Sequence, residues 1–436
     1  MIAAEHLPIY ILLGTFVVLM VLRVPITFCL LFATLASAQA NGTRLSVMVR
    51  QLLDGVNNFS LLAIPFFILM GEFMGAGGIS DKIIDFTNLI VGRFRGGLAY
   101  VNVLSSMLFG GISGSAVADV SSMGPVVIPM MEKQGYSREF SVGLTVTTAC
   151  QGVLIPPSHN MVIYALAAGG VSIGSLLMAG VFPGILLGAC FMVFCWALGG
   201  YYNFPQGVSI PRDQWGKIIL HAILPLLTVA IIMVGTGAGV FTATESAAIA
   251  CMYVFFLSYF IFRSAKITKI GDVLRNALRT LSIVMALIAC AKAFSYMMTE
   301  LRVPEMVTTT LLSITTSKIL LLLLINLLLL VLGCFMDMAP LIMIMTPILL
   351  PVVTSPVVGM HPIQFGVMLI FNLALGLCTP PVGSALFVGC AVGKTTIEET
   401  SKKMLPLFGV MVFALMLVTF IPAISLWLPT TLFGIQ

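Results

Sequence analysis

The chain has 436 residues, of which 59% are hydrophobic and only 8% are charged, and its mean hydropathy is +1.12. This composition excludes a soluble globular protein. The net charge of +5 comes from lysines and arginines in loops and does not indicate nucleic-acid binding. Nine cysteines are scattered through apolar segments without C-x-x-C or metal-finger spacing, so we expect neither a structural disulfide nor a metal cluster.

Apolar runs of about 17–30 residues recur along the chain, and each is long enough as a helix to cross a bilayer core. The first begins at Leu7 without a basic stretch or a cleavage site before it, which is typical of a retained span. The predicted spans are 7–22, 24–41, 59–77, 138–168, 172–201, 217–237, 242–262, 280–299, 361–393 and 404–430. We therefore expect one polytopic membrane domain over residues 1–436.

Four further segments are predicted to be helical without crossing the membrane. Two apolar stretches, near 97–131 and 318–354, are interpreted as re-entrant hairpins that enter and leave by the same side. Ile79–Arg95 and Thr395–Lys403 are amphipathic and polar enough to lie along the interface as helical arms.

Two regions of the chain, 110–184 and 334–409, align loosely with each other. The pair Pro156-Pro157 returns 224 residues later as Pro380-Pro381, and each pair interrupts an apolar stretch. The other equivalent positions are Pro125 and Pro347, Pro129 and Pro351, Gly143 and Gly366, Gly152 and Gly376, and Pro183 and Pro406. A duplicated membrane chain with one broken helix in each half has the layout of a secondary transporter.

The basic residues predict the orientation, because cytoplasmic loops carry more lysine and arginine than outer loops. With the N-terminus outside, sixteen fall in cytoplasmic loops: Arg23, Lys82, Arg93, Arg95, Lys133, Arg138, Arg212, Lys217, Arg263, Lys266, Lys269, Arg275, Arg279, Lys394, Lys402 and Lys403. Four fall outside, namely Arg44, Arg50, Arg302 and Lys318, and Lys292 lies within a span. The first hairpin then opens to the cytoplasm and the second to the outside, so the repeats have inverted topology.

The proline pairs predict where ions bind. A proline cannot donate a hydrogen bond to the carbonyl four residues back, at a cost of about 3 kcal/mol to a helix. We expect the first pair to free the carbonyls of Gly152 and Val153, and the second those of Gly376 and Leu377. At bilayer depth such oxygens must line a cavity or bind a cation such as Na⁺. A kinked helix without a ligand is the alternative for one pair, but two equivalent pairs favour a site.

The hairpin tips supply the other half of this predicted site. Gly110–Ser115 and its counterpart Gly333–Pro340 are turns of small and polar residues within apolar hairpins. We expect each tip to meet the broken helix of its own repeat at mid-membrane, where helix N-termini near Ser158 and Gly383 favour anions. Two related polar pockets result, with Ser113, Ser115, Ser158 and Asn160 in one, and Asp337, Thr379 and Ser384 in the other.

Ionisable residues inside spans are costly and each needs a reason. Asp337 is the preferred Na⁺ ligand, whereas Asp119 is either a ligand or a hydrogen-bond partner of the hairpin's own backbone. The other three are interpreted as structural groups that cap helices, snorkel or pair with one another: Glu72, Glu245 and Lys292. His159 follows Ser158, but no third group completes a catalytic triad, so we do not expect an enzyme.

With these residues in place, the chain resembles the large membrane subunit of a tripartite ATP-independent periplasmic (TRAP) transporter, a branch of the ion-transporter superfamily. The motifs that carry the likeness are Pro65–Glu72, Gly110–Asp119, Ile155–Ser158, Gly239–Glu245, Pro347–Pro351 and Thr379–Gly383. Ala243 stands where the family pattern leads us to expect a second proline.

The resemblance implies an all-α membrane protein that imports an organic acid with Na⁺ across a bacterial inner membrane, with no cofactor besides the coupling ion. It also implies two partners, a separate small four-helix membrane subunit and a periplasmic substrate-binding protein. In the implied elevator mechanism, transport elements at 97–184 and 318–409 slide against a scaffold of the remaining helices. Each set contains one hairpin and one broken helix.

By the same resemblance, specific residues hold Na⁺ where each tip meets its break. The first set is Ser113, Gly114, Gly152 and Ile155, and the second is Gly333, Asp337, Gly376 and Thr379. The substrate carboxylate lies between the tips, near Ser115, Ser158, Asn160 and Ser384.

Three alternatives stay open at this point. A Na⁺/dicarboxylate symporter of the same superfamily needs no binding protein; a channel would need a pore lined by charge; an intramembrane hydrolase would depend on Ser158. The substrate is a C4-dicarboxylate, sialic acid or another sugar or keto acid, and the lack of an arginine cluster favours a monocarboxylate such as sialic acid.

Overall fold

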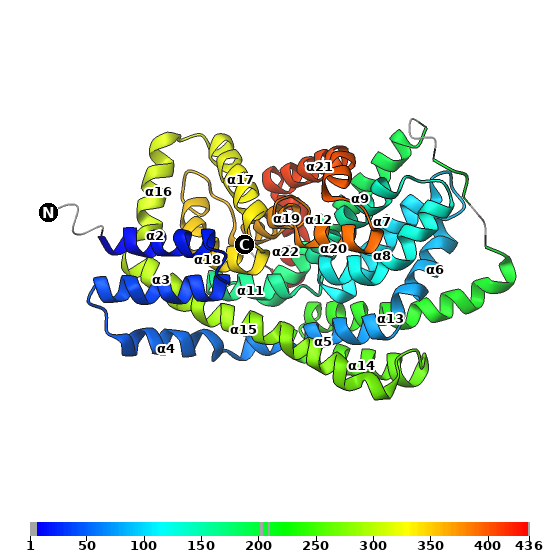
Figure 1. Ribbon diagram of the computed structural model, residues 1–436, viewed down its shortest axis with the longest axis horizontal. Coiled ribbons are helices and arrows are strands. Elements are labelled where there is room, and N and C mark those ends of the chain that lie inside the picture. The colour runs from blue at the N-terminus through cyan, green and yellow to red at the C-terminus, as the bar shows by residue number, and fades with distance from the viewer. Residues whose placement is uncertain (1–6, 201–203, 208–209, 435–436) are drawn as a thin grey trace.

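The computed structural model describes residues 7–200, 204–207 and 210–434, and every regular element in these ranges is helical (Figure 1). The first half contains α2 (Leu7–Val21), α3 (Ile26–Ala40), α4 (Leu45–Val56), α5 (Ala63–Ala76), α6 (Ile79–Val91), α7 (Gly97–Ser113), α8 (Ala116–Lys133), α9 (Arg138–Ala149), α10 (Gln151–Leu154), α11 (His159–Ala168) and α12 (Ile173–Leu198). The second half contains α13 (Trp215–Gly237), α14 (Ala243–Phe256), α15 (Ile270–Glu300), α16 (Val303–Ile314), α17 (Lys318–Phe335), α18 (Met338–Val353), α19 (Pro362–Gly376), α20 (Ser384–Gly393), α21 (Ile397–Phe420) and α22 (Pro422–Phe433).

Seven helices in the described ranges are long and apolar enough to cross a membrane. They are Phe59–Ala76, Ile173–Leu198, Arg212–Gly237, Ala243–Ile261, Ile267–Glu300, Lys318–Phe335 and Ile397–Phe420. Six overlap predicted spans, and Lys318–Phe335 is the first arm of the second predicted hairpin. The helices at 7–21 and 26–40 are shorter but also apolar.

Both predicted hairpins are pairs of helices joined by two residues. Gly114 and Ser115 join α7 to α8, and Met336 and Asp337 join α17 to α18. Ser115 and Asp337 are therefore the N-cap residues of equivalent helices. Both members of each pair pack on the first half of a broken helix, α9 for the first pair and α19 for the second.

The two predicted helix breaks are present. The span predicted at 138–168 consists of α9 and α10, an irregular stretch at 155–158, and α11. The span predicted at 361–393 consists of α19, an irregular stretch at 377–383, and α20. Both interruptions contain the proline pairs.

A pair of glycines, one on the first hairpin and one just before the first break, allows the two backbones to cross in direct contact. A Cβ atom on Gly152 would lie 2.5 Å from the Gly110 Cα, and one on Gly110 would lie 2.2 Å from the Gly152 Cα. At the tip, Gly114 has φ +65° and a Cβ atom there would lie 2.2 Å from the Pro157 carbonyl oxygen. Only glycine satisfies both the backbone conformation and the close approach at this position.

The second repeat has the same crossing. A Cβ atom on Gly376 would lie 2.6 Å from the Gly333 carbonyl oxygen. The Val382 N–H donates to the Cys334 carbonyl at 3.1 Å and so fastens the break to the tip. The prediction that each tip meets the break of its own repeat is therefore correct.

The carbonyls of the second break are not free, which corrects the prediction made for Gly376 and Leu377. The Gly376 carbonyl accepts from the Thr379 N–H at 3.0 Å, and the Leu377 carbonyl accepts from the N–H groups of Ala385 and Leu386 at 3.1 and 3.3 Å. A turn within the break supplies the donor for Gly376, and the first amides of α20 supply the donors for Leu377, so both replace the donors that the prolines lack.

The two repeats pack directly against each other. The Tyr164 hydroxyl on α11 donates to the Pro362 carbonyl at 2.6 Å, and the Tyr164 ring covers Gly366 so closely that a Cβ atom would lie 2.4 Å from Cε1. The Sγ atoms of Cys150 and Cys378, both free thiols, are 3.0 Å apart. The broken helices of the two halves thus form a shared core.

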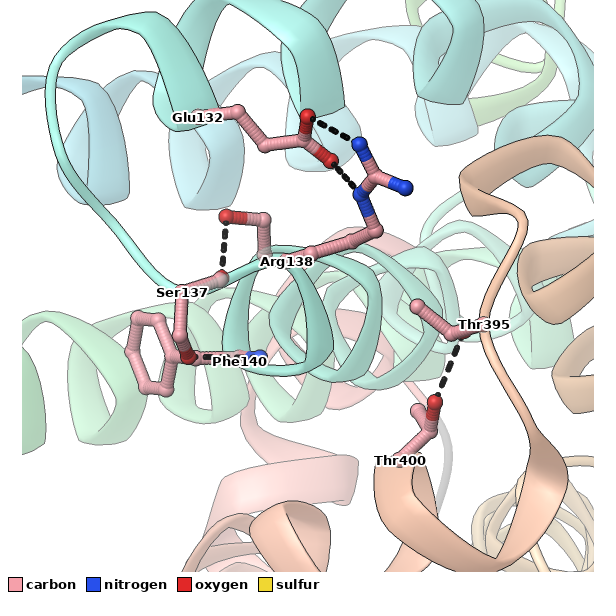
Figure 2. Close-up of polar contacts among 7 residues, drawn as sticks. Glu132, Ser137, Arg138, Phe140, Thr395 and Thr400 are labelled. Atoms are coloured by element: carbon pink, nitrogen blue, oxygen red, sulfur yellow. Dashed lines mark hydrogen bonds and ion pairs between the residues drawn. The ribbon is translucent and has the colours of Figure 1, made fainter.

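The helix ends that we predicted to be cytoplasmic are fixed by local polar contacts (Figure 2). Arg138 at the start of α9 forms a two-point ion pair with Glu132, at 2.6 and 3.0 Å, across the α8–α9 turn. The hydroxyl of Thr395, in the turn after α20, is 2.9 Å from the hydroxyl of Thr400 in the first turns of α21.

In Figure 1, α2, α3 and α4 lie side by side, and α15 runs past them toward α5 and α14. Helix α15 contacts α3, α4 and α5 and also reaches α18. It starts ten residues before the predicted span at 280–299, and α4 and α16 lie in stretches predicted as outer loops.

The C-terminal prediction needs correction. Thr395–Lys403 is not a separate arm, because Thr396 caps α21 by accepting from the Glu399 N–H and the helix continues to Phe420. The span predicted at 404–430 is interrupted at Ile421, which is extended before Pro422. A residue before proline disfavours the helical conformation, which explains the interruption.

We expect Gly152→Ala to destabilise the protein, because its methyl group would overlap the backbone of α7. Forced overpacking of this kind costs about 1–3 kcal/mol. Thermal unfolding of the purified protein in detergent measures the effect. Gly409→Ala is the matched control, since a Cβ atom there meets nothing within 4 Å. Equal melting temperatures for the two variants would contradict the crossing.

We expect Tyr164→Phe to lower the stability by about 0.5–1.5 kcal/mol, because it removes the hydrogen bond to the Pro362 carbonyl. Tyr10→Phe is the control, since Tyr10 is 66% exposed. The same unfolding assay applies. A Tyr164→Phe protein as stable as the Tyr10→Phe control would show that this contact does not hold the repeats together.

Candidate functional site

A cavity of about 980 Å³ lies between the two hairpin tips and the layer formed by α5 and α15. Its walls include residues from both tips and from both broken helices. The prediction of two related polar pockets is thus replaced by one continuous space that both repeats line.

The cavity receives the N-termini of four helices, α8, α11, α18 and α20. The residues at these N-termini that line the cavity are Ser115 and Ala116, His159 and Asn160, Met338 and Ala339, and Ser384. The unpaired N–H groups and the dipole at a helix N-terminus attract negative charge. Four such dipoles around one space suit a carboxylate, although at α20 the amides of Ala385 and Leu386 already bond the Leu377 carbonyl.

On the first repeat's side, the tip presents hydroxyl groups. The Ser113 hydroxyl is buried and has no hydrogen-bond partner. Ser115 caps α8 by accepting from the Ala118 N–H at 3.4 Å. The Asn160 amide donates to the Met338 Sδ at 3.8 Å, so the first break touches the second tip.

On the second repeat's side, Asp337 occupies the position equivalent to Ser115. Its side chain makes no capping bond to the amides of α18, and it lines the cavity. The Ser384 hydroxyl at the start of α20 lies next to this carboxylate without completing a hydrogen bond to it. A carboxylate and an unpaired hydroxyl at one wall are oxygen groups of the kind that hard cations prefer.

The structure brings some of the predicted site residues to the cavity and leaves others behind its wall. Those that line it are Ser113, Ser115, Asn160, Asp337 and Ser384. Those that do not are Gly114, Gly152, Ile155, Ser158, Gly333, Gly376 and Thr379. The glycines of this second group form the crossings.

Three members of the second group have side chains whose surroundings differ. The Ser158 hydroxyl is buried without a hydrogen-bond partner. Ile155 fills the space above Gly111 and Gly184, where Cβ atoms would lie 3.0 and 2.3 Å from its side chain. The Thr379 hydroxyl donates to the Leu375 carbonyl at 2.7 Å, which leaves its lone pairs available.

The two breaks differ in exposure. Residues 155–158 of the first break are all buried, whereas Thr379 is half-buried and Pro380, Pro381 and Val382 are exposed. The sequence repeat did not predict this difference, because it depends on which helices cover each break.

The opposite wall contains residues that sequence reasoning treated as structural or passed over. Glu72 from α5, Asp272 and Asn276 from α15, and Lys266 and Lys269 just before α15 line the cavity. For Glu72, the motif at 65–72 was the available indication, since it carried part of the family likeness. Nothing in the local sequence of α15 distinguished its cavity face.

The other ionisable residues have varied positions. Glu245 forms a capping box with Thr242, which confirms its structural role. Lys292 is exposed on α15 beside Gly55, where a Cβ atom would lie 2.9 Å from the lysine Cβ. Asp119 is fully buried and does not line the cavity.

Among the described residues, no group of three or more His, Cys, Asp or Glu side chains could hold a metal ion. The hydroxyl, carboxylate and backbone oxygens around the tips are a different kind of ligand set. Such oxygens match the preference of hard cations. A hard cation therefore fits the chemistry of the tips better than a soft transition metal.

The sequence matches the family model described as "Tripartite ATP-independent periplasmic transporter, DctM component" over residues 13–424. The C4-dicarboxylate TRAP transporter large permease protein DctM of Vibrio cholerae is 37% identical over 397 residues, which cover 86% of this chain and 87% of the relative. The sialic acid TRAP transporter large permease protein SiaM of the same organism is 36% identical over 414 residues, which cover 94% and 96%.

A solved structure, that of the YdaH transporter of Alcanivorax borkumensis, superposes with a TM-score of 0.60 at 15% identity and covers 86% of this chain and 88% of that one. At this identity the likeness shows the fold alone. The relatives named above are transport permeases and not enzymes. The chain belongs to the DctM family and is the large membrane subunit of a TRAP transporter, a multi-pass protein of the bacterial inner membrane.

Proposed function

We propose that this subunit imports an organic acid by symport with Na⁺. The observation that carries the proposal is the cavity of about 980 Å³ that receives four helix N-termini and both hairpin tips. The N-termini attract the carboxylate, while Asp337 and the unpaired hydroxyls supply oxygens for a cation.

The proposed Na⁺ sites lie where each tip meets its break. Ser113 and Gly114 with Gly152 and Ile155 form the first. The second is formed by Gly333, Asp337, Gly376 and Thr379. The tight backbone crossings at both places support this assignment, because they keep main-chain oxygens close to the tip.

The proposed substrate is a carboxylate that binds between the tips, near Ser115, Ser158, Asn160 and Ser384. The named relatives transport C4-dicarboxylates and sialic acid, which supports this class of substrate. No arginine lines the cavity among the described residues, and this favours a monocarboxylate such as sialic acid over a dicarboxylate.

The electrical gradient can drive this uptake. Each net positive charge that moves inward gains about 2.3 kcal/mol per 100 mV of membrane potential. With one Na⁺ in each of two equivalent sites, a monoanion crosses with net positive charge and is accumulated against a gradient. A measured Na⁺ Hill coefficient near one, together with a single bound ion, would contradict two sites.

An elevator movement accounts for access from both sides. The cavity extends to Lys266, Lys269 and Asp272, in the loop that the distribution of basic residues places in the cytoplasm. In this proposal the conformation is the inward-open one, and α5 and α15 belong to the scaffold. The elements at 97–184 and 318–409 move outward together to collect the substrate.

Two partners complete the proposed transporter. Membership of the family implies a small membrane subunit and a periplasmic binding protein that delivers the acid. The alternative is a symporter of the same superfamily that takes its substrate directly from solution.

Reconstitution in liposomes tests the proposal. The chain is inserted with its small subunit, and uptake of labelled sialic acid and succinate is measured with and without an inward Na⁺ gradient and with or without the binding protein. Uptake that needs both Na⁺ and the binding protein supports the proposal. Na⁺-driven uptake without the binding protein favours the alternative symporter, and uptake indifferent to Na⁺ rejects the coupling.

We expect Asp337→Asn to raise the Na⁺ concentration for half-maximal uptake by roughly 10- to 150-fold, because a charged ligand group contributes about 1.5–3 kcal/mol. Asp54→Asn is the control, since Asp54 is exposed and faces Arg50. The Na⁺ dependence of initial uptake rates measures both. A normal Na⁺ dependence in the Asp337→Asn protein would remove this residue from the site.

A further inference from the structure

A second polar cluster lies inside the first repeat, away from the cavity. Asp119 on α8 is 0% exposed, and neither of its carboxylate oxygens has a hydrogen-bond partner. It does not bond the hairpin backbone, which was one of its two predicted roles. A buried carboxylate without a hydrogen-bond partner is costly in free energy. A bound proton or cation therefore has to neutralise it.

Buried oxygen groups from α7 and α9 surround this position. The Ser106 hydroxyl on α7 lies next to the Asp119 carboxylate without completing a hydrogen bond to it. The Thr148 hydroxyl on α9 is 3.3 Å from the Ser106 hydroxyl and 3.2 Å from the Asn102 amide oxygen. Each of these residues is at most 1% exposed.

The cluster has more acceptor oxygens than protons to share. The Thr148 hydroxyl has a single proton but lies within hydrogen-bond distance of four oxygens, including the Leu144 and Thr145 carbonyls at 2.8 and 3.2 Å. The Asn102 amide already donates to the Thr145 hydroxyl at 2.7 Å. A small cation is the group that such an oxygen-rich space lacks.

No basic side chain neutralises Asp119 within the described ranges. The ion pairs found there are Arg50 with Asp54, Arg138 with Glu132, and Lys402 with Glu398. Asp119 lies in the first turn of α8, where the helix dipole favours the ionised carboxylate over the neutral acid. A cation bound at this position would neutralise the ionised carboxylate.

We propose that Asp119, with the Ser106 and Thr148 hydroxyls, binds a Na⁺ separate from the two sites at the tips. The inference rests on the proposed Na⁺ coupling. The second repeat has no counterpart, because Leu341 stands four residues after Asp337 as Asp119 stands four residues after Ser115. The first repeat therefore carries one more cation than the second, and the transport cycle moves one more positive charge inward.

Equilibrium binding of ²²Na⁺ to the purified full-length chain tests this site without knowledge of the substrate. We expect Asp119→Asn to bind one Na⁺ fewer per chain than the wild type, and Asp54→Asn to bind the wild-type number. We expect the double variant Asp119→Asn/Asp337→Asn to lose one Na⁺ more than either single variant. A double variant that matches Asp337→Asn alone would mean that both residues hold the same ion, against the proposal.

Ser106→Ala and Thr148→Val decide the matter if Asp119→Asn does not fold. Each should weaken the binding of one Na⁺ by roughly two- to tenfold, as expected for the loss of one hydroxyl ligand. Binding curves identical to the wild type in both variants, or an unchanged Na⁺ number in a folded Asp119→Asn protein, would overturn the site. A wild-type chain that binds no Na⁺ would instead reject the proposed coupling itself.

Discussion

Backbone N–H and C=O groups at a helix break inside the bilayer have no water to form hydrogen bonds with. This constraint determines the structure at the centre of the molecule. The chain meets it by pressing each hairpin tip onto a break, through Gly110 on Gly152 and Gly333 on Gly376. The Val382 N–H and the carbonyls of Gly376 and Leu377 all form hydrogen bonds with nearby backbone groups. Because these contacts are made by the main chain, side chains around them are left free to face a ligand.

The duplication produces two similar frameworks but not two similar surroundings. The first break is buried among helices of both repeats, whereas the second is exposed at Pro380, Pro381 and Val382. The N-cap positions also differ, because Ser115 caps its helix and Asp337 does not. Equivalent backbones therefore carry different chemistry, and of the two tips it is the second that places a charged side chain, Asp337, in the cavity.

Much of the architecture could be predicted from the sequence because its breaks and turns depend on local residues. The proline pairs located both interruptions, and small residues located both tips to within a few positions. The far wall of the cavity could not be predicted. Glu72 and Asn276 reach it only because α5 and α15 pack across from the tips, and no periodicity along either helix records that arrangement. The Gly376 carbonyl was mispredicted for a different reason, since a local turn within the break supplies its donor, the Thr379 N–H.

The contact of Asn160 with Met338 joins the break of one repeat to the tip of the other. In the proposed mechanism, an ion bound at the second tip would therefore also affect part of the first repeat's wall. If one ligand raises the affinity for the other through this shared contact, the second ligand raises the affinity for the first by the same factor, because coupling between two binding equilibria is reciprocal. In the proposed mechanism, ion binding at the second tip and substrate binding at the first repeat's wall are therefore coupled through this contact.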